Sequence, residues 1–310
     1  MSGGLTADDA QTPCPGPGAP CVEITPARHA SIGDLEVDRA LPSRARRTVG
    51  AWCFADHMLP TRSGLGIGPH PHIGLHTVTW LVEGEVLHKD SLGSEQPIRP
   101  GQLNLMTAGN GIAHAEEDAG SGGVTHGAQL WVAQPDATRH GAPAFEHHAE
   151  LPRVDLAPGT GTVLVGSHGG ATSPARADTP LVGLDLDLPD GAAPVLGLDP
   201  AFEHALVVLT GALEVDGRTV EPGHLAYLGL GRDELRTTAR GHVRVLLLGG
   251  EPFEAVPLMW WNYVGRTAEE IQQAHDDWEA DTGRFAPIDS VLPRIPSIAP
   301  IGLARRANRG

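Results

Sequence analysis

Cysteine is scarce in this sequence, which has Cys14, Cys21 and Cys53 only. Three is too few, and an odd number, for a disulfide framework. Cys14 and Cys21 flank the segment PGPGAP, so a local bridge between them stays open if this part of the chain meets an oxidant. The cysteine content therefore argues against a disulfide-stabilised secreted domain.

The sequence also lacks a long apolar run and the features of a secretory leader. No run approaches the ~20 residues of a membrane span. The first residues, MSGGLTADDAQ, contain neither a basic stretch nor an apolar one. We expect a protein with no membrane partner and a cytoplasmic location.

Basic residues are outnumbered by acidic ones. Lysine and arginine total 22 against 38 aspartates and glutamates, and the formal net charge is −16. Contact with phosphates requires a clustered basic face, and none is evident. Direct nucleic-acid binding is therefore not expected, whereas a small-molecule or protein partner is compatible with this charge.

Glycine and proline are abundant, with 40 and 27 residues respectively. This composition favours many short strands joined by turns over long helices. A chain of 310 residues has room for one large or two ordinary domains. Residues 1–21 offer almost nothing to bury, so we predict a disordered tail before Val22.

Two short histidine patterns attract attention within residues 68–117. His70 and His72 are separated only by Pro71, and His114 and Glu116 only by Ala115. In an extended strand, residues i and i+2 point to the same face, so each pair can direct two donor groups to one point. If the two strands lie side by side in a small barrel, three imidazoles and one carboxylate converge, which is a typical ligand set for a divalent transition metal. The alternative is that these are ordinary core or surface residues among the 16 histidines of the chain.

The segments around these pairs resemble a known family. PHPHIGLHTVTWLVEGEV, HKDSLGS and PGQLNLMTAGNGIAHAE are similar to the pirin family of the cupin superfamily, and HGAQLWV, GGEP and WWN extend the resemblance over most of the chain. The resemblance implies an all-β fold of two tandem cupin barrels with a C-terminal helix, and the metal in the N-terminal barrel. It places the family's metal ligands on His70, His72, His114 and Glu116. Cupins often have a glutamate four residues after the second histidine, but here His76 occupies that position, either beside the ligands or as a competing ligand.

An internal repeat supports two barrels. The strand, glycine turn and strand of residues 82–86, followed by Pro100 and Gly101, recur at 209–213, followed by Pro222 and Gly223. The second copy has no His-x-His pair, and we predict that it has lost its metal. The resulting division is a tail at 1–21, a metal-binding barrel at 22–135, an excursion between the barrels at 136–180, a metal-free barrel with the C-terminal helix at 181–290, and a tail at 291–310.

The C-terminal helix has its own local signals. Thr267 to Glu270 form a capping-box pattern, in which the threonine hydroxyl and the glutamate carboxylate satisfy free N–H groups at a helix start. We expect the helix to run to about Asp281. Ile271, Ala274 and Trp278 are spaced to line one buried face.

Four protein ligands on a metal that accepts five or six leave one or two positions open, unlike a closed structural zinc site. We favour Fe(II), with Ni, Cu, Co, Mn or Zn as alternatives. The metal would stabilise an oxyanion and bind O₂, and Glu116, a ligand that can swing away, would act as the base.

These features lead to a first hypothesis, that of a quercetin 2,3-dioxygenase-like enzyme. It would oxygenate a flavonol or a related enediol or catechol, as the resemblance also implies for some pirins. The rival is a non-enzymatic, iron-dependent redox sensor that binds a regulatory protein, and a third hypothesis makes the metal purely structural. The enzyme needs an open apolar pocket, for which Phe54, Met58, Leu65 and Ile67 are candidate walls, with ordinary core packing as the alternative.

Overall fold

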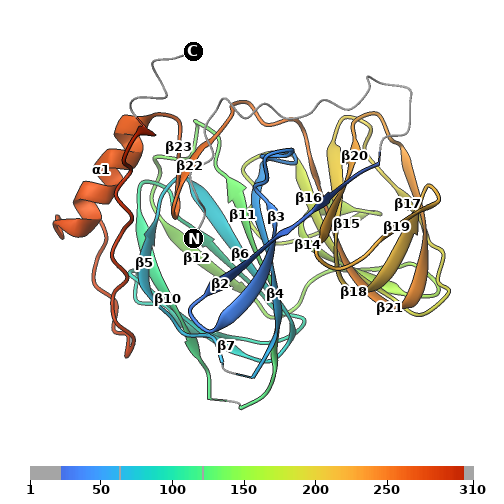
Figure 1. Ribbon diagram of the computed structural model, residues 1–310, viewed down its shortest axis with the longest axis horizontal. Helices are drawn as coiled ribbons and strands as arrows, with labels where there is room; N and C mark the ends of the chain where they lie inside the picture. The colour runs from blue at the N-terminus through green and yellow to red at the C-terminus, as the bar shows by residue number, and fades with distance from the viewer. Residues whose placement is uncertain (1–21, 63, 121, 304–310) are drawn as a thin grey trace.

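The computed structural model describes residues 22–62, 64–120 and 122–303. Figure 1 shows two β-barrels side by side, with helix α1 (Ala268–Glu279) on the outer side of the first barrel. The predicted all-β architecture with a C-terminal helix is confirmed. The predicted disorder of residues 1–21 and a Cys14–Cys21 bridge lie outside the described residues, and Cys53 is a buried free thiol.

The first barrel is made of two sheets. Its strands are β2 (Arg28–Ile32), β3 (Leu35–Leu41), β4 (Trp52–Thr61), β5 (Ile67–His72), β6 (Leu75–Glu83), β7 (Val86–Asp90), β8 (Glu95–Ile98), β9 (Leu103–Thr107), β10 (Ile112–Asp118), β11 (Thr125–Ala133) and β12 (Ala144–His148). One sheet has the order β12-β9-β6-β11-β4-β3-β2, and the other β5-β10-β7-β8. The two predicted histidine pairs therefore lie on neighbouring strands of the smaller sheet.

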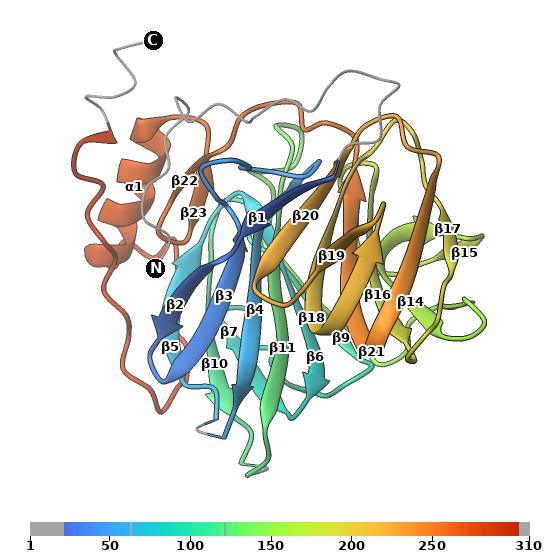
Figure 2. The same cartoon turned by 45° about the vertical axis from the view of Figure 1, so that its right-hand side comes forward.

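The second barrel forms a ten-stranded sheet. Its strands are β1 (Glu23–Pro26), β13 (Arg153–Asp155), β14 (Thr160–His168), β15 (Ala171–Thr172), β16 (Leu181–Leu188), β17 (Val195–Gly197), β18 (Glu203–Val215), β19 (Arg218–Val220), β20 (His224–Gly229) and β21 (Glu234–Gly250). β1 pairs with β20, so the described part of the chain begins on the second barrel before it enters the first, as Figure 2 shows.

The two barrels share one apolar core. Trp52, Trp80 and Leu103 of the first barrel lie in the same buried cluster as Leu164 and Leu248 of the second. The Trp52 indole N–H is within hydrogen-bonding distance of the Val182 and Gly249 carbonyl oxygens, at 3.2 and 3.1 Å. The barrels are thus packed as one unit.

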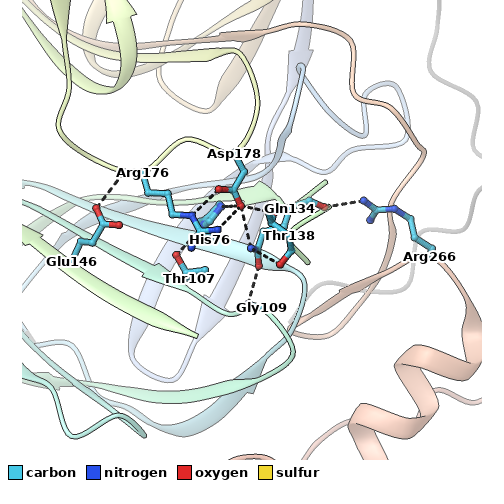
Figure 3. A network of polar contacts seen from close by, with 9 residues as sticks. All are labelled: His76, Thr107, Gly109, Gln134, Thr138, Glu146, Arg176, Asp178 and Arg266. Atoms are coloured by element: carbon cyan, nitrogen blue, oxygen red, sulfur yellow. Dashed lines mark hydrogen bonds and ion pairs between the residues drawn. The ribbon is translucent and has the colours of Figure 1, made fainter. Parts of the chain in front are cut away.

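The region between the barrels is divided between them. β12 pairs with β9 of the first barrel, whereas β13 to β15 join the sheet of the second. Asp178, near the end of this region, reaches the first barrel and accepts hydrogen bonds from Thr138, Gln134 and Arg176 (Figure 3). The domain boundaries at 135 and 180 stay predictions.

The C-terminal region begins with a short hairpin made of β22 (Leu258–Trp260) and β23 (Tyr263–Gly265). Helix α1 (Ala268–Glu279) follows this hairpin. Thr267 is the N-cap, and its side chain accepts from the Glu270 N–H. The predicted face of Ile271, Ala274 and Trp278 is buried, and the helix ends two residues before the predicted Asp281. Among the described residues, no helix is long and apolar enough to span a membrane.

Candidate metal centre

Three histidines meet inside the first barrel. His70 and His72 come from β5 and His114 from β10, and the antiparallel register sets His114 opposite His70. The three rings are buried, with one donor atom of each within 4.8 Å of the other two. The alternation of side chains along the two strands thus brings the three predicted imidazoles together.

Two tight turns position these strands. Gly74 follows β5 with a φ of +67°, and a Cβ there would lie 2.1 Å from the Val264 carbonyl oxygen. Gly109 precedes β10 with a φ of +52°, and a Cβ there would lie 2.2 Å from the Gly141 carbonyl oxygen. Only glycine satisfies both the left-handed backbone and the close approach, so these turns fix where β5 ends and β10 begins.

Hydrogen bonds define the tautomers of two rings. His70 Nδ1 lies 2.9 Å from the Gly68 carbonyl oxygen, and His72 Nδ1 lies 3.0 Å from that of Asn262. A carbonyl only accepts, so each Nδ1 must carry the proton and each Nε2 keeps a free lone pair.

His114 is oriented by a longer chain of contacts. Asp90 accepts from His88 Nε2 at 3.2 Å, which leaves His88 Nδ1 to accept from His114 Nδ1 at 3.4 Å. His114 Nε2 then also presents a lone pair, only 3.0 Å from His72 Nε2. Lone pairs directed at one point repel each other unless they share a cation, so this donor set fits a metal ion.

Burial keeps the three imidazoles neutral. It lowers the pKa of His70 to about 4 and those of His72 and His114 well below 6.5. Neutral imidazole is the form that binds a metal, so no proton has to be displaced at neutral pH.

Glu116 lines the same cavity as the histidines, but it is not part of the three-histidine group. The β5–β10 pairing is regular through His114 and then shifts register, so that Glu116 lies opposite Ile67. Burial raises the pKa of Glu116 to about 7, against a hydrogen bond from Thr79 that lowers it. Its roles as metal ligand and as catalytic base stay predictions.

The cavity in front of the histidines has a volume of about 150 Å³. Phe54, Met58 and Ile67 line it, as anticipated for a pocket wall. Leu65 is not among the lining residues and is buried in an apolar cluster with Leu35 and Met58. Phe54, Met58 and Ile67 also pack in apolar clusters, so core packing and a place in the cavity wall coincide for these three.

Sequence reasoning missed two kinds of wall residue. Asp56 lines the cavity and is held by a buried, bidentate ion pair with Arg39, at 2.7 and 2.6 Å. Trp261, Asn262, Ile295 and Pro296 reach the cavity from the C-terminal region. No spacing in the sequence marks Asp56 or the four C-terminal wall residues, although the WWN segment at 260–262 belongs to the family resemblance.

His76 takes no part in the cluster. Its Nδ1 contacts the Thr107 hydroxyl at 2.9 Å and its Nε2 contacts Asp178 at 3.1 Å (Figure 3). In the second barrel, His204, His224 and His242 form no comparable group. Within the described residues, His70, His72 and His114 are the one set of three or more donors that could hold a metal.

Comparison with known proteins agrees with this geometry. The Pirin family model matches residues 34–132, and the model of the Pirin C-terminal cupin domain matches residues 183–286. A Pseudomonas aeruginosa protein named "putative quercetin 2,3-dioxygenase" is 50% identical over 275 residues, which cover 87% of each chain. A pirin-like protein of Caulobacter vibrioides is 37% identical over 282 residues, covering 84% of this chain and 97% of the relative. The crystal structure of a quercetin 2,3-dioxygenase from Acinetobacter baumannii superposes with a TM-score of 0.85 at 43% identity, over 90% of this chain and 95% of that one.

Two tandem cupin barrels with a histidine cluster in the first define the class of protein as a bicupin with a candidate metal centre. Within that class, the chain belongs to the pirin family.

Proposed function

We propose that this protein is a metal-dependent dioxygenase that acts on a flavonol or on a related enediol or catechol, with O₂ as the second substrate. His70, His72 and His114 would hold the metal, with Glu116 as a fourth ligand. A bound divalent transition metal supplies Lewis acidity for a substrate oxyanion and a site for O₂. Fe(II) is our choice of metal, and Ni, Cu, Co, Mn and Zn suit the same donors.

The observation that supports this proposal most strongly is the convergence of three imidazole lone pairs on an apolar cavity. His72 and His114 direct their Nε2 atoms toward each other across 3.0 Å, and the cavity beside them is lined by Phe54 and Trp131. A sensor that only reports its redox state would not need an apolar pocket beside the metal, whereas an enzyme does.

Glu116 is the residue that we propose takes the proton from a hydroxyl group of the substrate. Its carboxylate lines the cavity beside the histidines, within reach of a substrate placed there. Taking the proton from a substrate hydroxyl would leave the oxyanion that the metal stabilises. The names of the two most similar proteins described above support the same reaction class.

The test is oxygen consumption by metal-reconstituted protein. Apo protein is loaded separately with Fe(II), Mn, Co, Ni and Cu, and O₂ uptake is recorded with quercetin and with catechol. Uptake that depends on both metal and substrate supports the proposal. If no metal gives uptake with either compound, the enzymatic function is wrong and a regulatory role becomes the better account.

A further inference from the structure

Two residues that follow α1, Ile295 and Pro296, form part of the wall of the cavity beside the three histidines. After α1 the chain runs without regular secondary structure along β5, the strand that carries His70 and His72 (Figure 1). We name residues 287–298 the strap. The match to the C-terminal family model ends at residue 286, so the strap lies outside the matched region.

The strap is fixed to the first barrel near its beginning and at its middle. Near its beginning, Glu117 accepts hydrogen bonds from the Ser290 hydroxyl at 2.5 Å and from the Val291 N–H at 3.3 Å. At its middle, the Ile295 N–H donates to the Pro69 carbonyl at 2.9 Å, one residue before His70.

The strap approaches β5 closely. A Cβ at Gly68 would lie 2.0 Å from the Pro293 carbonyl oxygen, so β5 has no side chain where the strap crosses it. This backbone contact brings the next strap residues to the cavity.

Helix α1 and the preceding hairpin hold the outer side of the strap. The Trp278 indole N–H donates to the Ile295 carbonyl at 2.9 Å, and the Arg294 guanidinium lies 3.6 Å from the centre of the Trp278 ring. Ser297 contacts His275 at 2.8 Å through its hydroxyl. These contacts place Ile295 and Pro296 in the wall of the cavity beside the histidines.

The size of the cavity limits what fits beside the histidines. A volume of about 150 Å³ is that of a cavity known to hold one benzene ring. A catechol carries its two oxygens on a terminal ring, so that ring can enter alone. A flavonol carries its reacting oxygens on the middle of three rings, so it needs more room beside the histidines than a single ring does.

We infer that the strap makes this centre selective for single-ring or small open-chain compounds with two adjacent oxygens, and that a three-ring flavonol binds only when Ile295 and Pro296 move aside. This inference rests on the proposed function. Ile295 and Pro296 are thus specificity-determining residues, supplied by a segment distant in sequence from the metal ligands.

The test compares ligand binding by metal-loaded protein without O₂. Isothermal titration calorimetry with catechol and with quercetin is performed on the wild type and on a variant carrying both Ile295→Ala and Pro296→Ala. Relief of overpacking is expected to strengthen quercetin binding about tenfold or more, with catechol affinity changed about twofold at most. Val291→Ala is the matched control, because Val291 lies in the strap with its side chain 87% exposed and away from the cavity.

Metal content and circular dichroism verify that each variant is folded and loaded. If the double variant loses its metal, Ile295→Val, which removes one methyl group from the wall, is measured in its place and should shift quercetin affinity in the same direction. Equal affinity of the wild type for both compounds, or an equal shift for both in the variant, would overturn the inference. Oxygen uptake reports separately on the proposed function, since selective binding without uptake contradicts that function and leaves the strap's selectivity intact.

Discussion

At the scale of single residues, backbone carbonyls set the chemistry of the centre. The Gly68 and Asn262 carbonyls hold the protons of His70 and His72 on Nδ1, so the Nε2 atoms are free to bind a metal. Asn262 follows Trp261, a non-glycine residue with a φ of +52°. The turn between β22 and β23 therefore helps to orient the candidate metal centre without contributing one of its three histidines.

Replacing His72 by alanine should remove the metal and leave the fold intact, because the ring contributes a donor atom and the surrounding barrel core is untouched. The affinity for metal should fall by more than the roughly 10–100-fold that loss of an outer-shell partner costs. Elemental analysis and equilibrium dialysis provide the measurement. His242→Ala is the control, since this exposed histidine contacts Asp187 in the second barrel. Full metal occupancy in His72→Ala would remove His72 from the proposed ligands.

Asp90→Asn tests the outer contacts of the same centre. Asp90 fixes the proton of His88 on Nε2, and His88 in turn accepts from His114. An amide nitrogen facing His88 Nε2 would favour the other tautomer of His88 and shift the His114 proton toward the metal side. We expect metal affinity to fall roughly 10–100-fold with the three ligands unchanged. Unchanged affinity, measured by competition with a chelator, would show that His114 is oriented without Asp90.

At the scale of elements, the polar network around Asp178 joins the region between the barrels to the turn before β10. Asp178 contacts Gln134, whose amide oxygen accepts from the Gly109 N–H at 2.8 Å (Figure 3). Burial alone would raise the pKa of Asp178, but hydrogen bonds from His76, Arg176 and Thr138 outweigh it and hold the pKa well below its usual range. The carboxylate therefore stays charged in the fold.

Asp178→Asn should lower the free energy of unfolding by about 2 kcal/mol at neutral pH, the size of a hydrogen-bonded charge. Because the folded pKa lies below the unfolded value of about 3.9, the carboxylate stabilises the fold above that value. The stabilisation is lost as the pH falls through the folded pKa, so the variant should lose less stability than the wild type in acid. Urea unfolding at about pH 7 and pH 3 measures both effects, with the exposed Glu221→Gln as control. Parallel pH profiles for the wild type and Asp178→Asn would contradict this role.

Short sequence patterns predicted the features that depend on residues close together in the chain. The alternation at His70 and His72 and the cap at Thr267 are both readable within a few residues of sequence. Asp178 and the Arg39–Asp56 pair could not be predicted in the same way, because each joins residues that meet only after the sheets form. The register shift between His114 and Glu116 is a property of strand pairing, which the alternation of side chains within one strand does not reveal.

At the scale of the whole molecule, both ends of the described chain cross between parts of the fold. β1 pairs with β20 of the second barrel, and the strap crosses β5 of the first. Neither crossing has a local pattern in the sequence. The tandem repeat predicted two barrels, but it contained no information on which barrel each end would join.

Trp52 is the side chain that best tests whether the barrels unfold together. It is fully buried in the shared core and lies within hydrogen-bonding distance of two carbonyls of the second barrel. Trp52→Ala should cost about 3–5 kcal/mol, the range for removing a buried aromatic side chain. Chemical denaturation should show one transition in the wild type and a single, earlier one in the variant. Two separate transitions in the wild type would mean that the barrels are independent units.

The most direct test of the whole account is elemental analysis and O₂ uptake on one preparation, for the wild type and for His72→Ala. The account predicts about one transition-metal ion per chain and uptake with catechol in the wild type, with both lost in His72→Ala. Metal bound in the wild type without uptake for any of the metals tested would contradict the enzymatic function. Metal and uptake that persist in His72→Ala would contradict the site itself.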